Sequence, residues 1–186
     1  MNKTGVIYGI NGPVVYLKGN TGFKMSEMVY VGKERLVGEV IALTKDTTTV
    51  QVFEETTGLK PGETVTASRD ALSVTLGPGI LNNIFDGIER PLSEIAKQSG
   101  KYISRGLTVD SLDTEKKWDV HVTVSEGEEL MGGAIIAETQ ETRSIVHKSM
   151  VPPDVNGTVI WAAKDGKYTI LDPIVKLKLE DGTEKE

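Results

Sequence analysis

The feature that most constrains the fold is a series of short β-strand patterns between Gly5 and about Ser73, separated by glycine, proline and asparagine turn signals. The turn Asn11-Gly12-Pro13 divides the first two predicted strands. Further on, Thr48, Val50 and Val52 alternate with the residues of the opposite face, as in a half-buried strand. Several short strands at regular spacing favour a small closed barrel, because closure leaves no strand edge unpaired.

One glycine in this region has a predicted structural role. Gly38 interrupts the strongly apolar stretch 35–43, which itself predicts a strand. A glycine inside a strand marks either a bulge or a place where another backbone approaches closely, and both alternatives stay open here.

The stretch 76–92, LGPGILNNIFDGIERPL, predicts a helical hinge between two β regions. Its glycines and prolines break the chain at both ends. Between them, apolar residues recur at the i, i+3, i+4, i+7 spacing of a buried helical face, namely Leu81, Ile84, Phe85 and Ile88. A second short helical stretch ends near Gly100. We therefore expect a short helix with an apolar face that needs a larger domain to cover it.

Strand patterns resume at Trp118, where every second residue up to Val124 is apolar. Asp165-Gly166 predicts a hairpin between two β-rich arms, and Asp181-Gly182 predicts another. The second turn lies so close to Glu186 that no return strand is expected, which indicates a longer parent protein, although charged tails also fray.

The predicted fold is therefore mainly β. Residues 1–73 form an N-terminal β-barrel, residues 74–110 form the helical hinge, and residues 111–186 form a β-sandwich-like module of the barrel-sandwich hybrid kind.

Composition excludes several classes of function. The net charge of -6 argues against nonspecific binding to nucleic acid or to anionic lipid. There are no cysteines, so disulfides and thiolate metal sites are excluded. No signal peptide or membrane-spanning segment is recognisable, so we expect a cytoplasmic protein without direct membrane insertion.

A search for nucleotide-binding and catalytic motifs is negative. A phosphate-binding loop needs Ser or Thr after its Gly-Lys pair, but the pairs at 32–33, 100–101 and 166–167 are followed by Glu34, Tyr102 and Tyr168. The glycine-rich GPGIL stretch has no lysine and is interpreted as a structural hinge. A G-x-S-x-G nucleophile motif is also missing.

The two histidines do not predict a metal site. His121 and His147 lie in separate predicted strands without metal-ligand spacing, and the acidic clusters are interpreted as solvated turns. The sequence therefore predicts no catalytic, cofactor-binding or metal-binding residue in this chain.

Lys148 carries an alternative hypothesis. The stretch 141–159 resembles the region around the modified lysine of biotin and lipoyl carrier domains, and 125–140 resembles the strand pair that precedes it. His147 and Ser149 differ from the small and methionine neighbours that carrier ligases expect. The competing interpretation is that Lys148 is an ordinary side chain on a sandwich of similar shape.

Nearly the whole chain resembles the N-terminal part of the catalytic A subunit of V-type and A-type rotary ATPases. The most specific match is 71–92, which resembles the family's entry into its nucleotide-binding domain. The stretches 141–159 and 168–175 resemble the insertion, or bulge, that distinguishes the catalytic chain from its B-subunit relative. The remaining matching segments are 5–15, 36–43 and 49–65.

The resemblance implies an enzyme only for the intact catalytic chain, in which ATP hydrolysis or synthesis is coupled to proton or sodium transport. The family's nucleotide-binding and catalytic motifs follow the insertion, so ATP and Mg²⁺ would bind outside these residues. The barrel would assemble with B subunits, and 111–186 would contact peripheral-stalk subunits. A free-standing β-barrel adaptor unrelated to ATP is the third hypothesis.

Overall fold

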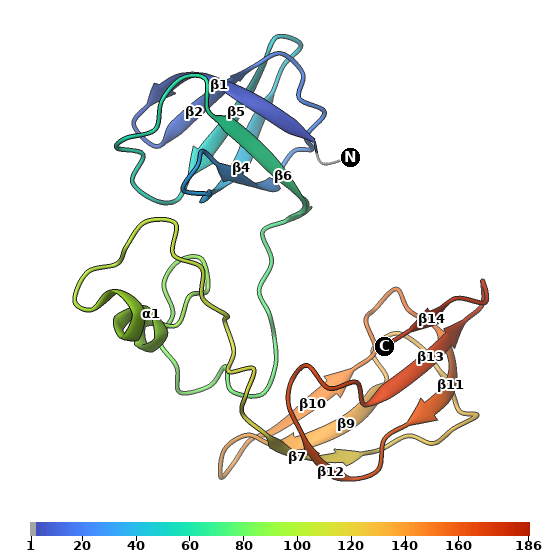
Figure 1. Cartoon of the computed structure of the whole chain (residues 1–186). Helices are drawn as coiled ribbons and strands as arrows, with labels where there is room; N and C mark the ends of the chain where they lie inside the picture. Colours follow the sequence, from blue (N-terminus) through green and yellow to red (C-terminus); the bar gives the residue numbers. More distant parts are fainter. Residues whose placement is uncertain (1–2) are drawn as a thin grey trace. The chain divides into compact units, whose positions relative to one another are not determined.

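The computed structural model describes residues 3–186 and is mainly β (Figure 1). The first two residues of the predicted 1–73 barrel lie outside the described residues. The chain divides into two compact units. One comprises residues up to Val74 together with Phe85–Val109, and the other comprises Thr75–Ile84 together with Asp110–Glu186. The segment between the two β regions is thus shared between the units.

The first unit contains the predicted closed barrel. Its strands are connected in the order β1-β2-β5-β4-β3-β6, and β6 pairs back onto β1. Their bounds are β1 (Thr4–Asn11), β2 (Val14–Lys18), β3 (Glu27–Val31), β4 (Leu36–Leu43), β5 (Thr47–Val52) and β6 (Thr64–Ala71). Every neighbouring pair is antiparallel, so the fold-class prediction for this region is confirmed.

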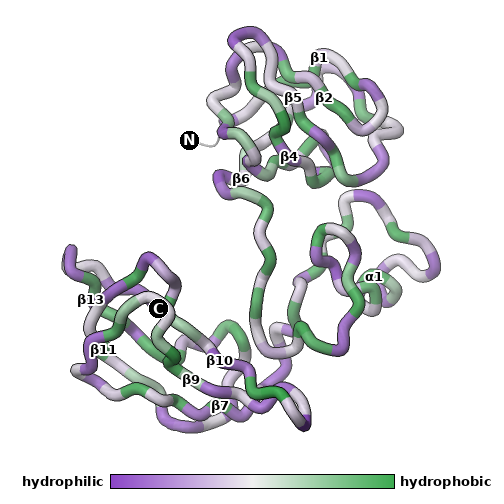
Figure 2. Tube along the Cα trace, turned by 180° about the vertical axis from the view of Figure 1, so that it is seen from behind, coloured by the Kyte–Doolittle hydropathy of each residue, from purple (hydrophilic) through white to green (hydrophobic). Residues whose placement is uncertain are grey.

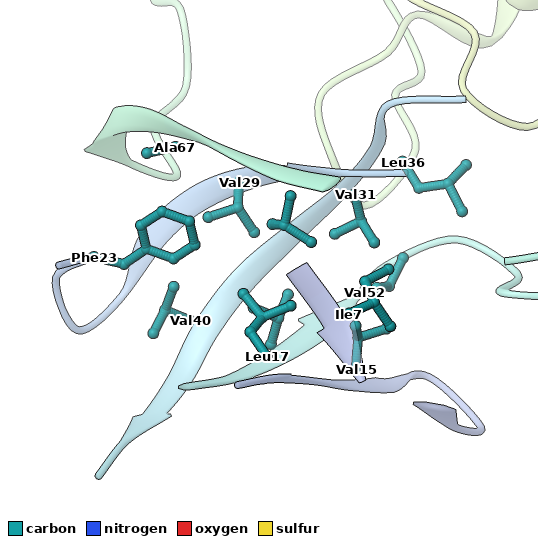
Figure 3. Close-up of a cluster of buried hydrophobic side chains, with 12 residues drawn as sticks. Ile7, Val15, Leu17, Phe23, Val29, Val31, Leu36, Val40, Val52 and Ala67 are labelled. Atoms are coloured by element: carbon teal, nitrogen blue, oxygen red, sulfur yellow. The ribbon is translucent and has the colours of Figure 1, made fainter. Parts of the chain in front are cut away.

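The barrel core follows from strand alternation. Buried aliphatic side chains from all six strands meet inside the barrel, and the aromatic ring of Phe23, from the loop between β2 and β3, packs with them (Figure 3). Thr48, Val50 and Val52 point inward together, as their spacing predicted. Gly38 marks a close approach, because a Cβ there would lie 2.7 Å from the carbonyl oxygen of Gln51. The register irregularity of this strand pair lies further along, between Val40 and Ala42.

The predicted helix over 81–88 is wrong. The first unit has its helix later, at α1 (Leu92–Ser99), which corresponds to the second helical stretch. Asn82 and Glu89 have φ angles of 66° and 65°, which an α-helix does not permit. The carboxylate of Asp86 accepts hydrogen bonds from the backbone N–H groups of Ile88 and Arg90, which replaces the helical pattern with a turn.

The second unit is a β-sandwich of two antiparallel sheets, ordered β10-β9-β7-β12 and β14-β13-β11-β8. Buried valines and leucines form its core, which includes Val151, Val159 and Leu177, and Val122 and Ile136 of the first sheet pack against it partly buried. The strand bounds are β7 (Trp118–Val122), β8 (Glu129–Leu130), β9 (Ile135–Gln140), β10 (Val146–Met150), β11 (Gly157–Ala162), β12 (Gly166–Tyr168), β13 (Val175–Leu179) and β14 (Glu184–Lys185).

The two hairpin predictions have different outcomes. Asp165-Gly166 does not close a hairpin, since β11 and β12 belong to different sheets and the chain crosses between them here. The Asp165 carboxylate instead accepts a hydrogen bond from the N–H of Val122 on β7. Asp181-Gly182 does join β13 to β14, so the return strand that was not expected is present.

Apolar and polar residues are interspersed along the strands of both units (Figure 2). Among residues 3–186, no helix is long and apolar enough to cross a membrane.

Candidate interaction sites

A buried ion cluster attaches residues 85–109 to the barrel. The Arg90 side chain, only 10% exposed, donates to the Asp86 carboxylate at 2.7 Å and to the Glu54 carboxylate at 3.4 Å, while the Glu54 side chain is 8% exposed. Arg90 also donates to the carbonyl oxygen of Leu107 at 3.1 Å. One guanidinium therefore connects a residue just after β5 with both arms of the 85–109 segment.

The surroundings of Asp86 favour its ionised carboxylate. Burial alone would raise the pKa of Asp86, but hydrogen bonds from the backbone and side chain of Arg90 outweigh it, so the pKa is lowered. Glu54 additionally accepts a hydrogen bond from the backbone N–H of Gly106 at 3.0 Å. Taking Arg90 away would leave two carboxylates in a poorly solvated site.

A second contact holds the same segment near the β3–β4 turn. Arg105 pairs with Glu34 at 3.2 Å and donates to the carbonyl oxygen of Thr57. Next to it, Gly106 has a φ of 64°, and a Cβ there would lie 2.1 Å from the carbonyl oxygen of Glu34. Only glycine fits this approach, because a side chain would clash with backbone.

In the second unit, Glu141 fixes the glycine-rich GPGIL stretch. Its side chain is 4% exposed, and Oε1 accepts hydrogen bonds from the backbone N–H groups of Gly79 at 2.8 Å and Leu81 at 3.0 Å. His147 Nδ1 lies 3.9 Å from the other carboxylate oxygen. Two amides of this stretch thus already bind an internal anion, which favours the interpretation of GPGIL as a structural hinge.

Lys148 lies within a strand rather than on a hairpin tip. It occupies the middle of β10 and is paired across the sheet with Glu138, at 3.8 Å between Nζ and Oε1. His121 is the next cross-strand neighbour of Glu138, and its Nδ1 lies 2.6 Å from Asp165. This charged row is the solvent-facing side of the sheet, so the carrier hypothesis for Lys148 is not supported.

Exposed apolar side chains differ from the predicted set. Of the four residues expected on a helical face, Leu81 and Ile84 are exposed, whereas Phe85 and Ile88 are partly buried. The second unit also exposes Leu76. In the first unit Tyr102 is exposed in the segment after α1. Helical periodicity could not identify this exposed side chain, because the residues after α1 are not helical.

The search for a metal-binding site is negative in the described part of the chain. Within residues 3–186, no group of three or more His, Asp or Glu side chains is arranged to hold a metal ion. The two histidines contact different carboxylates, His121 that of Asp165 and His147 that of Glu141.

Two family models match the chain in succession. Residues 7–69 match the ATP synthase alpha/beta family, beta-barrel domain, and residues 109–186 match the ATPsynthase alpha/beta subunit barrel-sandwich domain. The two matched ranges coincide with the barrel and the sandwich seen in the structure.

Similar proteins extend the match over the segment between these domains. The V-type ATP synthase alpha chain of Halothermothrix orenii is 48% identical over 182 residues, covering 98% of this chain and 31% of the relative. The A subunit of the A-type ATP synthase of Methanopyrus kandleri is 50% identical, with the same 98% and 31% coverage. That of Pyrococcus abyssi is 45% identical over 100% of this chain and 18% of its own length. The chain therefore belongs to the ATP synthase alpha/beta family, in which it corresponds to the N-terminal barrel and barrel-sandwich domains of the A subunits of A-type and V-type enzymes.

Proposed function

We propose that this chain serves as the N-terminal part of the catalytic A subunit of a rotary ATPase, which couples ATP hydrolysis or synthesis to proton or sodium transport. The observation that carries the proposal is the succession of barrel and barrel-sandwich domains at 48% identity to an ATP synthase chain over 98% of these residues. The chain spans 31% of the length of that relative, and ATP and Mg²⁺ would bind in the remainder.

In this proposal the two units have different mechanical roles. The barrel joins those of alternating A and B subunits in a ring, and the 111–186 module contacts peripheral-stalk subunits. Each unit has its own buried core, which supports a role as a rigid body that transmits force between subunits. The complex would work in the cytoplasm, attached to the membrane through its other subunits.

A chimeric catalytic chain tests the assembly role. In the Halothermothrix orenii chain, the region aligned with this sequence is replaced by residues 1–186, and the chimera is expressed with the other subunits of that complex. We expect assembled complexes with ATPase activity within about tenfold of the parent, a barrier change of about 1.4 kcal/mol. A folded chimera that does not co-purify with the B subunits would contradict the proposal.

Calorimetric titration of this chain with Mg-ATP tests the location of nucleotide chemistry. We expect no binding at millimolar ATP, because none of the Gly-Lys pairs in these residues is followed by the Ser or Thr of a phosphate-binding loop. Micromolar affinity would show that nucleotide binding lies within these residues, and that part of the proposal would be wrong.

A further inference from the structure

β10 is an unprotected edge of the sandwich. It forms one end of the sheet β10-β9-β7-β12, and within residues 3–186 only β9 pairs with it. An edge strand presents a row of unpaired backbone N–H and C=O groups, which can pair with another extended chain.

The pairing with β9 shows which backbone groups of β10 are free. The N–H of Glu141 donates to the carbonyl oxygen of Ile145 at 3.1 Å, so these two residues form a hydrogen-bonded pair. Hydrogen-bonded pairs alternate along an antiparallel ladder, so His147 and Ser149 also bond to β9. The N–H and C=O groups of Val146 and Lys148 therefore point away from the sheet.

Several side chains along β10 are apolar, whereas edge strands that are protected against pairing usually carry charged residues or proline. Ile145, Val146 and Met150 are 45%, 42% and 59% exposed. Met150 is paired with Ile135 on β9, which is 37% exposed. Apolar side chains next to free backbone groups are the arrangement that binds an added strand, since the ladder supplies affinity and the side chains supply selectivity.

Charge determines which strand fits. Lys148 is the central residue of β10, and its contact with Glu138 of β9 is long, at 3.8 Å, and leaves the Lys148 side chain 52% exposed. Arg143 is exposed in the turn before β10. If two full β10 strands paired with each other in antiparallel register, Lys148 would lie directly opposite Lys148, and like charges opposite each other are destabilising. An acidic residue opposite Lys148 would be favourable instead.

We propose that β10 binds an extended acidic segment of a partner protein as an added antiparallel strand, with a carboxylate opposite Lys148 and apolar residues beside Val146 and Met150. This inference rests on the proposed function, in which 111–186 is a contact surface for other subunits, and it identifies the strand and the chemistry of the partner segment.

Amide hydrogen exchange measured by NMR on the whole chain tests the proposal with two synthetic peptides. One alternates glutamate with valine, and the other alternates lysine with valine. At a glutamate-peptide concentration about ten times its Kd, exchange at the amides of Val146 and Lys148 should slow about tenfold, because only unbound protein exchanges there. The lysine peptide at the same concentration should leave both rates unchanged.

The variant Lys148→Glu should reverse this preference, so that the lysine peptide protects Val146. Lys167→Glu is the matched control, because Lys167 is exposed on β12 at the opposite edge of the same sheet. That control should retain the glutamate-peptide preference, and thermal melting checks that both variants fold.

Three results would overturn the inference. These are unchanged exchange at Val146 and Lys148 with the glutamate peptide, equal protection by both peptides, and protection that rises with protein concentration alone, which would make the occupant a second copy. Because the chimera experiment measures co-purification with the B subunits and ATPase activity, a negative peptide result beside an active chimera would refute the β10 inference and leave the proposed function standing.

Discussion

Replacing Arg90 by methionine should destabilise the barrel unit by about 3–5 kcal/mol, the usual cost of removing one partner of a buried ion pair. Methionine retains much of the volume, so the loss reports on charge and hydrogen bonding. Arg90 contributes hydrogen bonds to Asp86, Glu54 and the carbonyl oxygen of Leu107. Glu54 Oε1 is buried and has no hydrogen-bond partner in the described part of the chain, so an unpaired Glu54 charge has little compensation.

The matched control is Arg105→Met, an arginine of the same segment. Its side chain is 33% exposed and that of its partner Glu34 is 50% exposed. A solvent-exposed pair contributes about 0–1 kcal/mol, so the control should lose several-fold less stability than Arg90→Met. The difference between the two variants isolates the effect of burial.

Urea unfolding gives the stability change, and exchange of the Gly106 amide reports whether 85–109 leaves the barrel, since that amide donates to Glu54. Exchange at Gly106 should accelerate in Arg90→Met. Adding Glu54→Gln should recover part of the loss, because it removes an uncompensated charge. If Arg90→Met and Arg105→Met were equally stable, or the second substitution gave no recovery, the electrostatic reasoning would be refuted.

Three further predictions concern single positions. Glu141→Gln should weaken the charge-assisted bonds to the glycine-rich stretch, cost about 1–2 kcal/mol, and speed exchange of the two amides bound there. Gly38→Val should lower the melting temperature through an overpacking cost of about 1–3 kcal/mol or more, because its Cβ would meet the Gln51 carbonyl oxygen. The hydrogen bond to Asp165 raises the pKa of His121, so Asp165→Asn should lower that pKa toward its ordinary value in an NMR titration. The stabilisation from a raised His121 pKa is complete below the ordinary histidine value and is lost as pH rises through the raised one. If the pKa of His121 were the same in Asp165→Asn as in the unchanged chain, the argument about that hydrogen bond would be wrong. If Gly38→Val melted at the original temperature, the argument about overpacking would be wrong.

The barrel could be predicted because its information is local. The inward alternation at Thr48, Val50 and Val52 and the turn before β2 each depend on a few neighbouring residues, and closure follows from the need to protect edges. For Gly38 the sequence left two alternatives, a bulge or a close approach of another backbone, and the short distance to the Gln51 carbonyl oxygen shows the close approach. The sandwich alternation from Trp118 was equally local and is seen in the burial of β7.

Two of the incorrect predictions, the helix over 81–88 and the hairpin at Asp165-Gly166, have a common cause in side-chain competition for backbone groups. Four apolar residues at helical spacing cover barely two turns, and the Asp86 carboxylate binds amides that a helix would need. At Asp165-Gly166, the dipeptide favours a hairpin, yet the Asp165 carboxylate binds Val122 of another strand. The amides that Asp86 binds are close to it in sequence, whereas Val122 lies 43 positions from Asp165, so sequence proximity does not reveal the Asp165 contact.

The anchors of the segment between the two β regions could not be predicted, because each joins residues far apart in sequence. Glu141 binds the amide of Gly79 across 62 positions, and Arg90 reaches Glu54 across 36. These bonds lie in different units, so the segment is held at separate points on the sandwich and on the barrel. Weakening either anchor should therefore release its own portion of the segment while the other portion stays attached, and amide exchange at Gly79 and Gly106 distinguishes the two events.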